Sequence, residues 1–277
     1  MGRFHLFEIE DQPWCPRVLR DALTDYLRFV MDRFEPYAPA VPLLADALER
    51  LGETRVVDLC SGGGGPWLSL LRRLRAEGRT GVRVRLTDYY PNRPAFQRLH
   101  EESGGAIDGN DEPVDATDVP AHLDGLLTLF TALHHFRPDA ARRILQGAVR
   151  RGRGIAVFEA TRRSPVALLG MVFFSLGVLV FTPFVRPFRW SRLFWTYIIP
   201  LVPLLAWFDA TVSCLRTYTP AELRALAAAL GATEYRWESG MVRASRLLMP
   251  VTYLIGLPVK GAGPGGVRFK TSTAEAP

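Results

Sequence analysis

A short apolar segment followed directly by a run of glycines constrains the fold of this chain more than any other feature. Residues 55–67 read RVVDLCSGGGGPW, so two valines and an aspartate lead into four glycines and a proline. A glycine-rich turn between a buried strand and a helix lets a ligand lie against the main chain, because no Cβ atom stands in the way. Pro66 suits the first position of the following helix, whose first N–H groups are unpaired. The segment therefore predicts a strand–turn–helix unit that binds a ligand.

Strand and helix patterns alternate beyond this unit. Short apolar runs predict strands at residues 55–59, 82–88, 125–130 and 154–160. The run GLLTLF at 125–130 is continuous, which is typical of a strand covered on both faces. Helical patterns at 66–78 and 138–152 separate the strands. This βαβ alternation predicts an α/β domain with a parallel sheet.

Further helices and a pair of strands flank the alternating region. Apolar residues recur at helical spacing over 16–34, and a second helix is expected over 41–51. The segment 219–231, TPAELRALAAALG, has a capping box at its start and a glycine after its last turn. Two antiparallel strands are expected after it, over 233–242 and 251–258.

Two nucleotide-binding motifs fail at the glycine-rich turn. A Rossmann fingerprint needs G-x-G-x-x-G, and here Trp67 stands where the third glycine belongs. A P-loop needs G-K-[ST] after its glycines, and no lysine lies nearby. The pattern is instead an acidic residue at the strand end followed by alternating small residues, Asp58, Cys60, Gly62 and Gly64.

At these residues the sequence resembles the class I S-adenosylmethionine-dependent methyltransferases. Their first motif reads roughly (D/E)-x-G-x-G-x-G, and DLCSGGG at 58–64 matches it with Cys60 in place of the first glycine. The segments LTDYYPN, PVDATDVP and LFTALHHF resemble the next three motifs and follow in the family's order. The resemblance is clear over 55–160 and looser over 219–257, and it implies S-adenosyl-L-methionine as the cofactor.

The resemblance also implies roles for single residues. Asp88, which ends the second strand, is expected to bind the ribose hydroxyls, and Asp115 and Ala116 to flank the adenine. Asp88 as a turn residue and Asp115 as a helix cap are the structural alternatives. The implied cofactor-binding residues are Asp58, Ser61, Gly62, Gly64, Asp88, Tyr89, Asp115, Ala116, Thr131 and Trp14.

Aromatic faces near a sulfonium cation would stabilise it. Trp14, Tyr26, Tyr89 and Trp67 are candidates, and ordinary core packing is the favoured interpretation for Tyr26 and Trp67. Trp14 precedes the first helix, where a core role is less obvious, so its segment is expected to close over the cofactor.

The expected architecture is a Rossmann-like class I methyltransferase fold of the α/β class. It has a mostly parallel seven-stranded sheet with an antiparallel last strand, N-terminal helices and an apolar helical cap insertion. The expected divisions are an N-terminal helical lid at 1–54, the cofactor-binding core at 55–160, the apolar cap or interface insertion at 161–218, a C-terminal helix and strands at 219–258, and a flexible tail at 259–277.

The insertion is the unusual part of the chain. Val166–Phe184 carries no charge and is long enough to cross a membrane, but Pro183, Pro187, Pro200 and Pro203 punctuate its end and the residues that follow. A cap over an apolar substrate together with a homodimer interface is the favoured role, and contact with a membrane surface is the alternative. Arginines at 186, 189 and 192, interleaved with Phe188, Trp190 and Trp195, would suit lipid headgroups in that second case.

A narrower resemblance concerns the acceptor. The segments DQPWCPRVLRDALTDYLRF, HHFRPDAAR, RPFRWSRLFWTYIIPLVPLLAWFD and LRTYTPAEL resemble a group of small-molecule methyltransferases of actinobacteria. That group includes indole C3-methyltransferases of pyrroloindoline alkaloid biosynthesis. It implies carbon methylation of an indole-like heterocycle in natural-product biosynthesis. The alternatives are an O- or C-methyltransferase of a quinone or lipid at the membrane surface, and a catalytically silent protein that binds the cofactor.

Carbon methylation of such a ring needs a base near the ring N–H. His134 and His135 follow the fourth strand, and Glu159 ends the fifth at the carboxyl edge, where open α/β sheets bind ligands. Tyr218 is expected to orient the acceptor, together with Tyr197. The pair His134 and Glu159 is the favoured assignment, with His135 as the substitute.

Charge and cysteine content limit the partners. The formal net charge is +6, but the arginines are spread along the chain, and no (D/N)PP(Y/F) motif follows the fourth strand. Nucleic acid is therefore not expected as a partner; a small apolar or aromatic substrate is. Cys15, Cys60 and Cys214 lie far apart, which argues against a disulfide framework or a metal site and favours a cytoplasmic protein, with peripheral membrane contact as the alternative.

Overall fold

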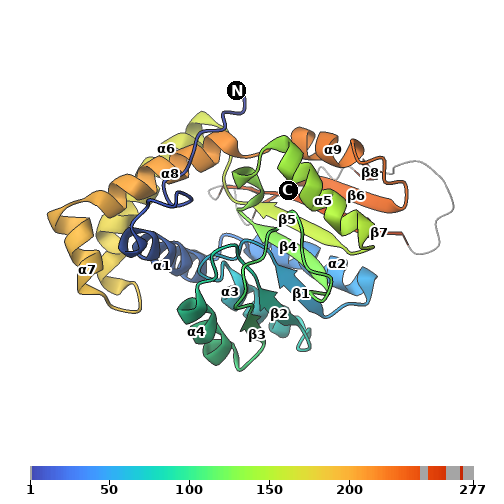
Figure 1. Ribbon diagram of the computed structural model, residues 1–277, viewed down its shortest axis with the longest axis horizontal. Helices are drawn as coiled ribbons and strands as arrows, with labels where there is room; N and C mark the ends of the chain where they lie inside the picture. The colour runs from blue at the N-terminus through green and yellow to red at the C-terminus, as the bar shows by residue number, and fades with distance from the viewer. Residues whose placement is uncertain (1, 244–248, 260–268, 271–277) are drawn as a thin grey trace. The chain divides into compact units, whose positions relative to one another are not determined.

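The computed structural model describes residues 2–243, 249–259 and 269–270 of the chain. It divides into two compact units (Figure 1). The sheet unit comprises Pro36–Ala160 and Tyr218–Pro277, and the helical unit comprises Met1–Glu35 and Thr161–Thr217. The first 54 residues therefore divide at Pro36 between the two units.

The sheet unit is built on a mixed sheet with the strand order β3-β2-β1-β4-β5-β7-β6-β8. Its strands are β1 (Arg55–Asp58), β2 (Arg83–Leu86), β3 (Ile107–Gly109), β4 (Leu126–Phe130), β5 (Ile155–Glu159), β6 (Tyr235–Val242), β7 (Val251–Pro258) and β8 (Phe269–Lys270). Strands β1 to β5 are parallel, and β7 runs antiparallel to both β5 and β6. The predicted sheet is thus confirmed, and the short β8, which pairs with β6, is added to it.

Helices lie on both faces of this sheet (Figure 1). They are α2 (Val41–Leu51), α3 (Trp67–Ala76), α4 (Arg93–Ser103), α5 (Pro138–Arg150) and α9 (Pro220–Ala228), with short 3-10 turns η1 (Ala38–Ala40) and η2 (Leu133–His135). Helix α9 starts with the capping box that the sequence predicts, formed by Thr219 and Glu222. Helix α4 and strand β3 were not expected from the sequence.

The core of the sheet unit keeps the central strands in place. Apolar side chains of β1, β4 and β5 pack with those of α5 and α9, among them Val57, Leu129, Val157, Leu145 and Leu223. Strand β4 lies between β1 and β5, with Val57 beside Leu127 and Leu127 beside Ile155 in register. The carboxyl ends of these three strands are therefore neighbours at one edge of the sheet.

The helical unit consists of α1 (Arg17–Phe34), α6 (Pro165–Phe181), η3 (Thr182–Phe184), α7 (Trp190–Leu193), the π-helical turn η4 (Phe194–Ile198) and α8 (Leu201–Arg216). Leu23 and Tyr26 of α1 share a core with Val178 of α6 and Leu205 of α8. The Tyr26 hydroxyl donates a 2.8 Å hydrogen bond to the Phe174 carbonyl of α6, and burial raises the pKa of Tyr26 to about 12. Tyr26 is thus a packing residue of this unit.

Two buried ion pairs hold the helical unit together. Arg192 of α7 pairs with Asp25 of α1, and both side chains are almost fully buried. Arg216 at the end of α8 pairs with Glu8 at 3.1 Å, and Asp209 accepts hydrogen bonds from the N–H groups of Ile9 and Glu10. The N-terminal segment is therefore attached to α8, and α1 to α7, by charged contacts that the sequence pattern did not indicate.

The tail expected over 259–277 lies largely outside the described residues. Within that range the structure describes only Val259 and β8.

The Asp25–Arg192 pair gives a stability prediction. Asp25→Asn leaves the Arg192 guanidinium buried without its closest countercharge, so the free energy of unfolding should fall by about 3–5 kcal/mol. Chemical denaturation of the full chain measures this. Arg17→Ala is the matched control on the same helix, because Arg17 is exposed and its pairing with Asp21 at 3.8 Å should contribute at most about 1 kcal/mol. Equal effects of the two substitutions would contradict the prediction.

Candidate functional site

The glycine-rich loop after β1 takes backbone conformations that side chains rarely adopt. Cys60, Gly62, Gly64 and Gly65 have φ values of 57°, 53°, 106° and 53°. A Cβ atom at Gly64 would lie 1.9 Å from Cδ1 of Leu99 in α4, whereas one at Gly62 would meet nothing within 4 Å. Gly64 therefore allows close packing, and Gly62 leaves space open beside the main chain. Cys60 adopts the left-handed conformation at the position where the motif has its first glycine.

Asp58 organises this loop from within. Its carboxylate accepts 2.7 Å hydrogen bonds from the hydroxyls of Thr128 in β4 and Ser61 in the loop. Thr87 donates to the Asp58 carbonyl through its hydroxyl and its N–H group, both at 2.8 Å. Burial raises the pKa of Asp58 to about 6, although both hydroxyl donors oppose that shift. Asp58 and Ser61 thus hold the ends of β1, β2 and β4 together.

Asp88 connects the end of β2 to the loop. One carboxylate oxygen accepts the Gly62 N–H at 2.8 Å, and the other accepts the Tyr90 N–H at 2.8 Å. Each carboxylate oxygen can accept more than one hydrogen bond, so these contacts leave capacity for ligand hydroxyls. The carboxylate is therefore fixed beside the open space at Gly62.

The segment expected to flank adenine forms a turn. Asp115 accepts hydrogen bonds from the N–H and the hydroxyl of Thr117, both at 2.8 Å, and Ala116 is buried. The Val114 N–H donates to the Asp88 carbonyl at 2.9 Å, which keeps the turn beside the end of β2. Tyr89 is 57% exposed. The Asp115 side chain thus shapes the turn.

Thr131 follows β4 and has a positive φ of 46°, a conformation costly for a β-branched residue. Its hydroxyl bonds to the Tyr37 hydroxyl and accepts the Ala160 N–H at 3.0 Å. Burial raises the pKa of Tyr37, so Tyr37 stays protonated near neutral pH. These contacts stabilise a strained residue at the strand end, where strain is typical of functional sites.

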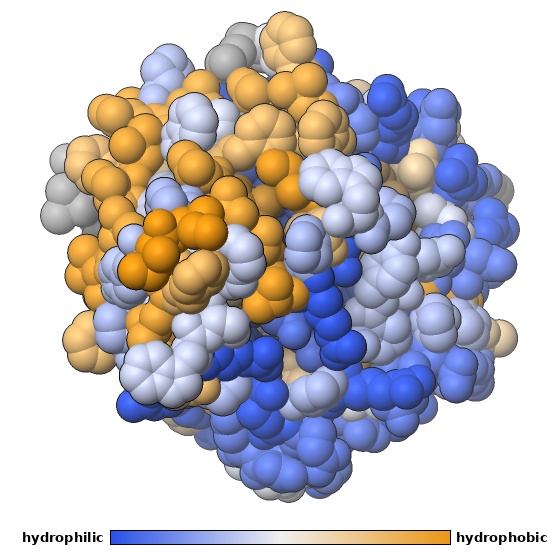
Figure 2. All heavy atoms as spheres, turned by 60° about the vertical axis from the view of Figure 1, so that its left-hand side comes forward, coloured by the Kyte–Doolittle hydropathy of each residue, from blue (hydrophilic) through white to orange (hydrophobic). Residues whose placement is uncertain are grey.

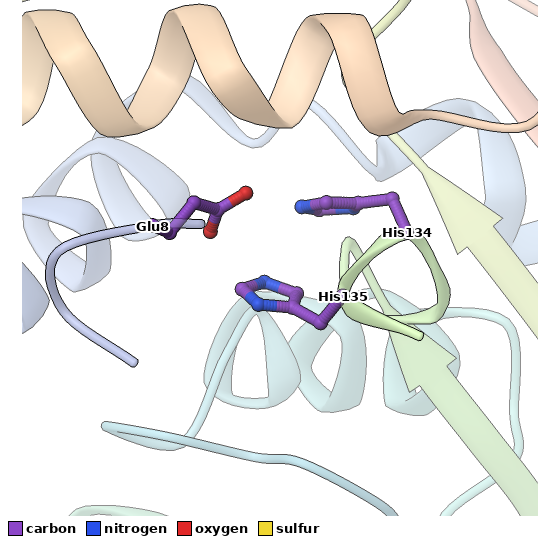
Figure 3. A group of neighbouring side chains, drawn as sticks. All are labelled: Glu8, His134 and His135. Atoms are coloured by element: carbon purple, nitrogen blue, oxygen red, sulfur yellow. The ribbon is translucent and has the colours of Figure 1, made fainter. Parts of the chain in front are cut away.

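His134 and Glu159 form a buried pair at the ends of β4 and β5. The His134 Nδ1 and Glu159 Oε2 atoms are 2.8 Å apart, and the His134 N–H donates to Oε1 at 3.1 Å. His135 extends from the same turn, with its ring centroid 4.4 Å from that of His134 (Figure 3). In the tautomer of neutral His134 whose Nδ1–H faces this carboxylate, Nε2 is the proton-accepting atom. Glu8, also drawn in Figure 3, belongs to the helical unit, where it binds Arg216.

The other candidates lie in different surroundings. The Tyr218 hydroxyl donates to the Phe136 carbonyl at 2.8 Å, just after η2. Trp67 is fully buried, with its ring centroid 5.5 Å from that of Phe130, and packs in the sheet unit. Trp14 belongs to the helical unit and is 64% exposed, so its closure over the cofactor stays a prediction.

Sequence reasoning missed three residues that support the site: Thr87, Thr128 and Tyr37. Thr128 could have been found, because it is a polar residue inside the otherwise apolar strand LLTLF. Tyr37 has no sequence signal, since its contact with Thr131 joins residues far apart in the chain.

The strand order explains why these residues gather. Asp58, Asp88, Thr131 and Glu159 all lie at or just beyond the carboxyl ends of β1, β2, β4 and β5. The order 3-2-1-4-5 reverses direction between β1 and β4, and open α/β sheets bind ligands at such a switch point. The glycine-rich loop and the His134 turn follow the two strands that meet there.

Several solved structures are similar to this chain. LaPhzM is 19% identical, with 91% of this chain and 60% of that chain covered and a TM-score of 0.51. A putative O-methyltransferase from Nostoc punctiforme is 14% identical over 92% and 64%, with a TM-score of 0.49. The mitomycin 7-O-methyltransferase MmcR is 17% identical over 87% and 55%, with a TM-score of 0.47.

These likenesses concern the fold. The chain spans between 55% and 64% of the length of these three structures. No protein-family model matches the chain. A search of curated proteins found no match either. The sheet order 3-2-1-4-5-7-6 with an antiparallel β7 is nevertheless that of the class I methyltransferases, and the sheet unit therefore has their Rossmann-like fold.

Asp58 gives a pH-dependent stability prediction. Its pKa is raised on folding from about 3.8 to about 6, so the folded state binds more protons than the unfolded state between these values. The contribution of Asp58 to stability therefore falls as the pH rises through this window. Asp58→Asn removes this pH dependence. The free energy of unfolding of the variant minus that of wild type should therefore increase by about 2 kcal/mol as the pH rises from 4.5 to 7.5.

Denaturant unfolding at several pH values measures this difference. Asp118→Asn, at an exposed position, is the control and should show no such trend. A constant difference between Asp58→Asn and wild type across the range would contradict the assignment.

Proposed function

We propose that the protein is an S-adenosylmethionine-dependent methyltransferase that acts on a small, flat or lipophilic acceptor. In its most specific form, the reaction is carbon methylation of an indole-like heterocycle in natural-product biosynthesis. The observation that carries the proposal is the Glu159–His134 pair, which lies at strand ends beside the glycine-rich loop of a methyltransferase fold.

The residues of the loop fit the cofactor. Gly62 leaves the main chain open, and the Asp88 carboxylate beside it is positioned to accept hydrogen bonds from ribose hydroxyls. The turn at Asp115 and Ala116 would border the adenine. When bound, the cofactor supplies a methyl group on a positively charged sulfur. The protein's part is to hold the acceptor in line with that group, and such positioning contributes much of the rate enhancement.

The Glu159–His134 pair supplies proton transfer. Glu159 holds the imidazole in the tautomer whose Nε2 accepts a proton, and its charge stabilises the imidazolium that results. His134 takes the ring N–H proton as the ring carbon accepts the methyl group, so the acceptor does not retain a positive charge. Glu159 is a positioning residue in this scheme, and His134 is the base. The Tyr218 hydroxyl, bonded to the Phe136 carbonyl, helps to hold the turn.

The same pair could also deprotonate a hydroxyl group. An O- or C-methyltransferase of a quinone or lipid is therefore the second candidate, favoured by the exposed apolar residues of the helical unit. Cofactor binding without turnover on any lipophilic acceptor would instead indicate a silent binding protein. The cap role expected for residues 161–218 stays a prediction.

Asp88 tests the cofactor assignment. Asp88→Ala removes two charge-assisted hydrogen bonds of about 1.5–3 kcal/mol each, so affinity should fall at least about tenfold. Gly62→Val should be worse, because its side chain fills the open space and its φ of 53° disfavours a branched residue. Isothermal titration calorimetry with S-adenosylhomocysteine measures both variants. Asp139→Ala, on the exposed surface of α5, should bind like wild type. Unchanged affinity of Asp88→Ala would refute the ribose assignment.

Single-turnover kinetics test the base. With an N–H 3-alkylindole as the acceptor, His134→Ala and Glu159→Gln should each lose more than about tenfold in rate, or roughly 1.4 kcal/mol. His135→Ala tests the substitute base in the same assay. If none of the three variants loses more than about tenfold, positioning alone carries the reaction.

A further inference from the structure

The segment between β5 and α9 has an unusual charge pattern. Residues 162–208 contain five arginines and no aspartate, glutamate or lysine. The arginines flank the two apolar helices: Arg162 and Arg163 precede α6, and Arg186, Arg189 and Arg192 follow it. The charged residues within 162–208 are therefore all positive, and two of them, Arg189 and Arg192, pair with aspartates of α1.

Helix α6 exposes a continuous apolar stripe. The residues of the stripe recur at helical spacing and are each between 50% and 77% exposed: Val166, Leu169, Phe173, Leu176 and Val180 of α6, continued by Phe184 of η3. Figure 2 shows the hydrophobic surface gathered on one side of this view, where the part of the molecule that contains α6 and α8 comes forward. A monomeric soluble protein rarely exposes an apolar face of this extent.

Neighbouring elements extend the stripe. Leu201, Leu204 and Trp207 of α8 are between 37% and 55% exposed, and α8 packs beside α6. Trp190 and Ile198, in the connection between these helices, are 78% and 71% exposed. Tryptophan near arginine at the edge of an apolar surface is typical of the boundary between lipid headgroups and acyl chains.

The inward faces of α6 and α8 differ from the exposed stripe. They pack on α1 through Val178, Leu205 and Leu23. Helix α1 carries ion pairs such as Arg28–Asp32 at 3.5 Å. The apolar stripe therefore lies on the side of α6 away from these charges, an arrangement that suits a membrane interface.

We propose that the α6–α8 face docks onto an anionic lipid bilayer and lies in the plane of its interface. The charge of the border decides between lipid and a second copy of the chain. A two-fold interface through this face would place the exposed Arg186 of each copy against a segment that contains no acid, which is unfavourable. Anionic headgroups complement the charge of Arg186.

The structure favours an in-plane arrangement over a crossing. Pro165–Phe184 is long and apolar enough to span, and Trp190–Ile198 with Leu201–Arg216 passes the same test only as a pair bent by 79°. Arg189, beyond the end of α6, lies 3.5 Å from both Asp21 and Asp25 of α1. Crossing would carry α1 and its charges into the hydrocarbon, which is costly. Insertion of the outward face alone leaves these charges in water.

Vesicle flotation of the purified full-length protein tests the proposal. The wild type should float with phosphatidylcholine–phosphatidylglycerol vesicles and bind those of phosphatidylcholine alone at least about tenfold more weakly, with high salt reducing the difference. The double variant Leu169→Glu, Phe173→Glu should lose at least about tenfold in binding to the anionic vesicles. Phe4→Glu is the matched control at another exposed aromatic residue, and should bind like wild type.

A second variant keeps the test independent of folding. Arg186→Gln changes only an exposed charge, and should weaken binding to the anionic vesicles while leaving binding to phosphatidylcholine unchanged. Failure of the wild type to bind either vesicle would overturn the proposal. So would a stable dimer in lipid-free solution that Leu169→Glu, Phe173→Glu dissociates, since the face would then belong to a second copy. Tight binding that is indifferent to lipid charge and to Arg186→Gln would overturn the anionic assignment.

Discussion

The hydrogen bonds of one buried carboxylate hold the candidate site together. Asp58 ends β1, and its carboxylate accepts hydrogen bonds from Thr128 of β4 and Ser61 of the glycine-rich loop. Its backbone carbonyl accepts a hydrogen bond from Thr87, just after β2. Three strand ends and the loop are thus linked around a group with only 2% exposure. A buried network of this kind is rigid only when its members are satisfied, so each hydroxyl matters for the geometry of the loop. The Asp88–Gly62 bond extends the same network toward the open space beside the main chain.

The two units differ in how they bury their apolar surface. The sheet unit buries its central strands under helices and leaves its polar groups at the carboxyl edge, where Glu159 and His134 form their pair. The helical unit buries only part of its apolar surface and secures its shape with ion pairs such as Asp25–Arg192. Buried ion pairs contribute little to stability over well-packed apolar residues, but the loss of one partner is costly. They therefore specify how α1 and α7 pack, while the outward face of α6 stays apolar.

Much of the sheet unit could be predicted from local pattern. The apolar runs predicted β1, β2, β4 and β5, and the capping box predicted the start of α9, because these signals depend on neighbouring residues. Strand β3 was missed, since IDG is three residues long with little apolar pattern. Helix α4 was missed because its exposed charged residues conceal a short stripe formed by Ala95, Phe96 and Leu99. The position of Glu159 at the sheet edge was predictable, but its bond to His134 was not.

The sequence by itself determined the local features of the candidate site: a glycine-rich turn after a buried strand, acids at the ends of β1, β2 and β5, and a histidine pair after β4. These features follow from local chemistry, since backbone freedom and strand length depend on adjacent residues. Only the tertiary structure decided which groups meet. It places His134 against Glu159 and Asp88 against Gly62. It also places the Asp115 side chain within a turn and leaves the α6 stripe exposed. The physical reason is that parallel strands bring residues far apart in sequence to one edge, and burial of a helix face depends on which neighbours pack against it.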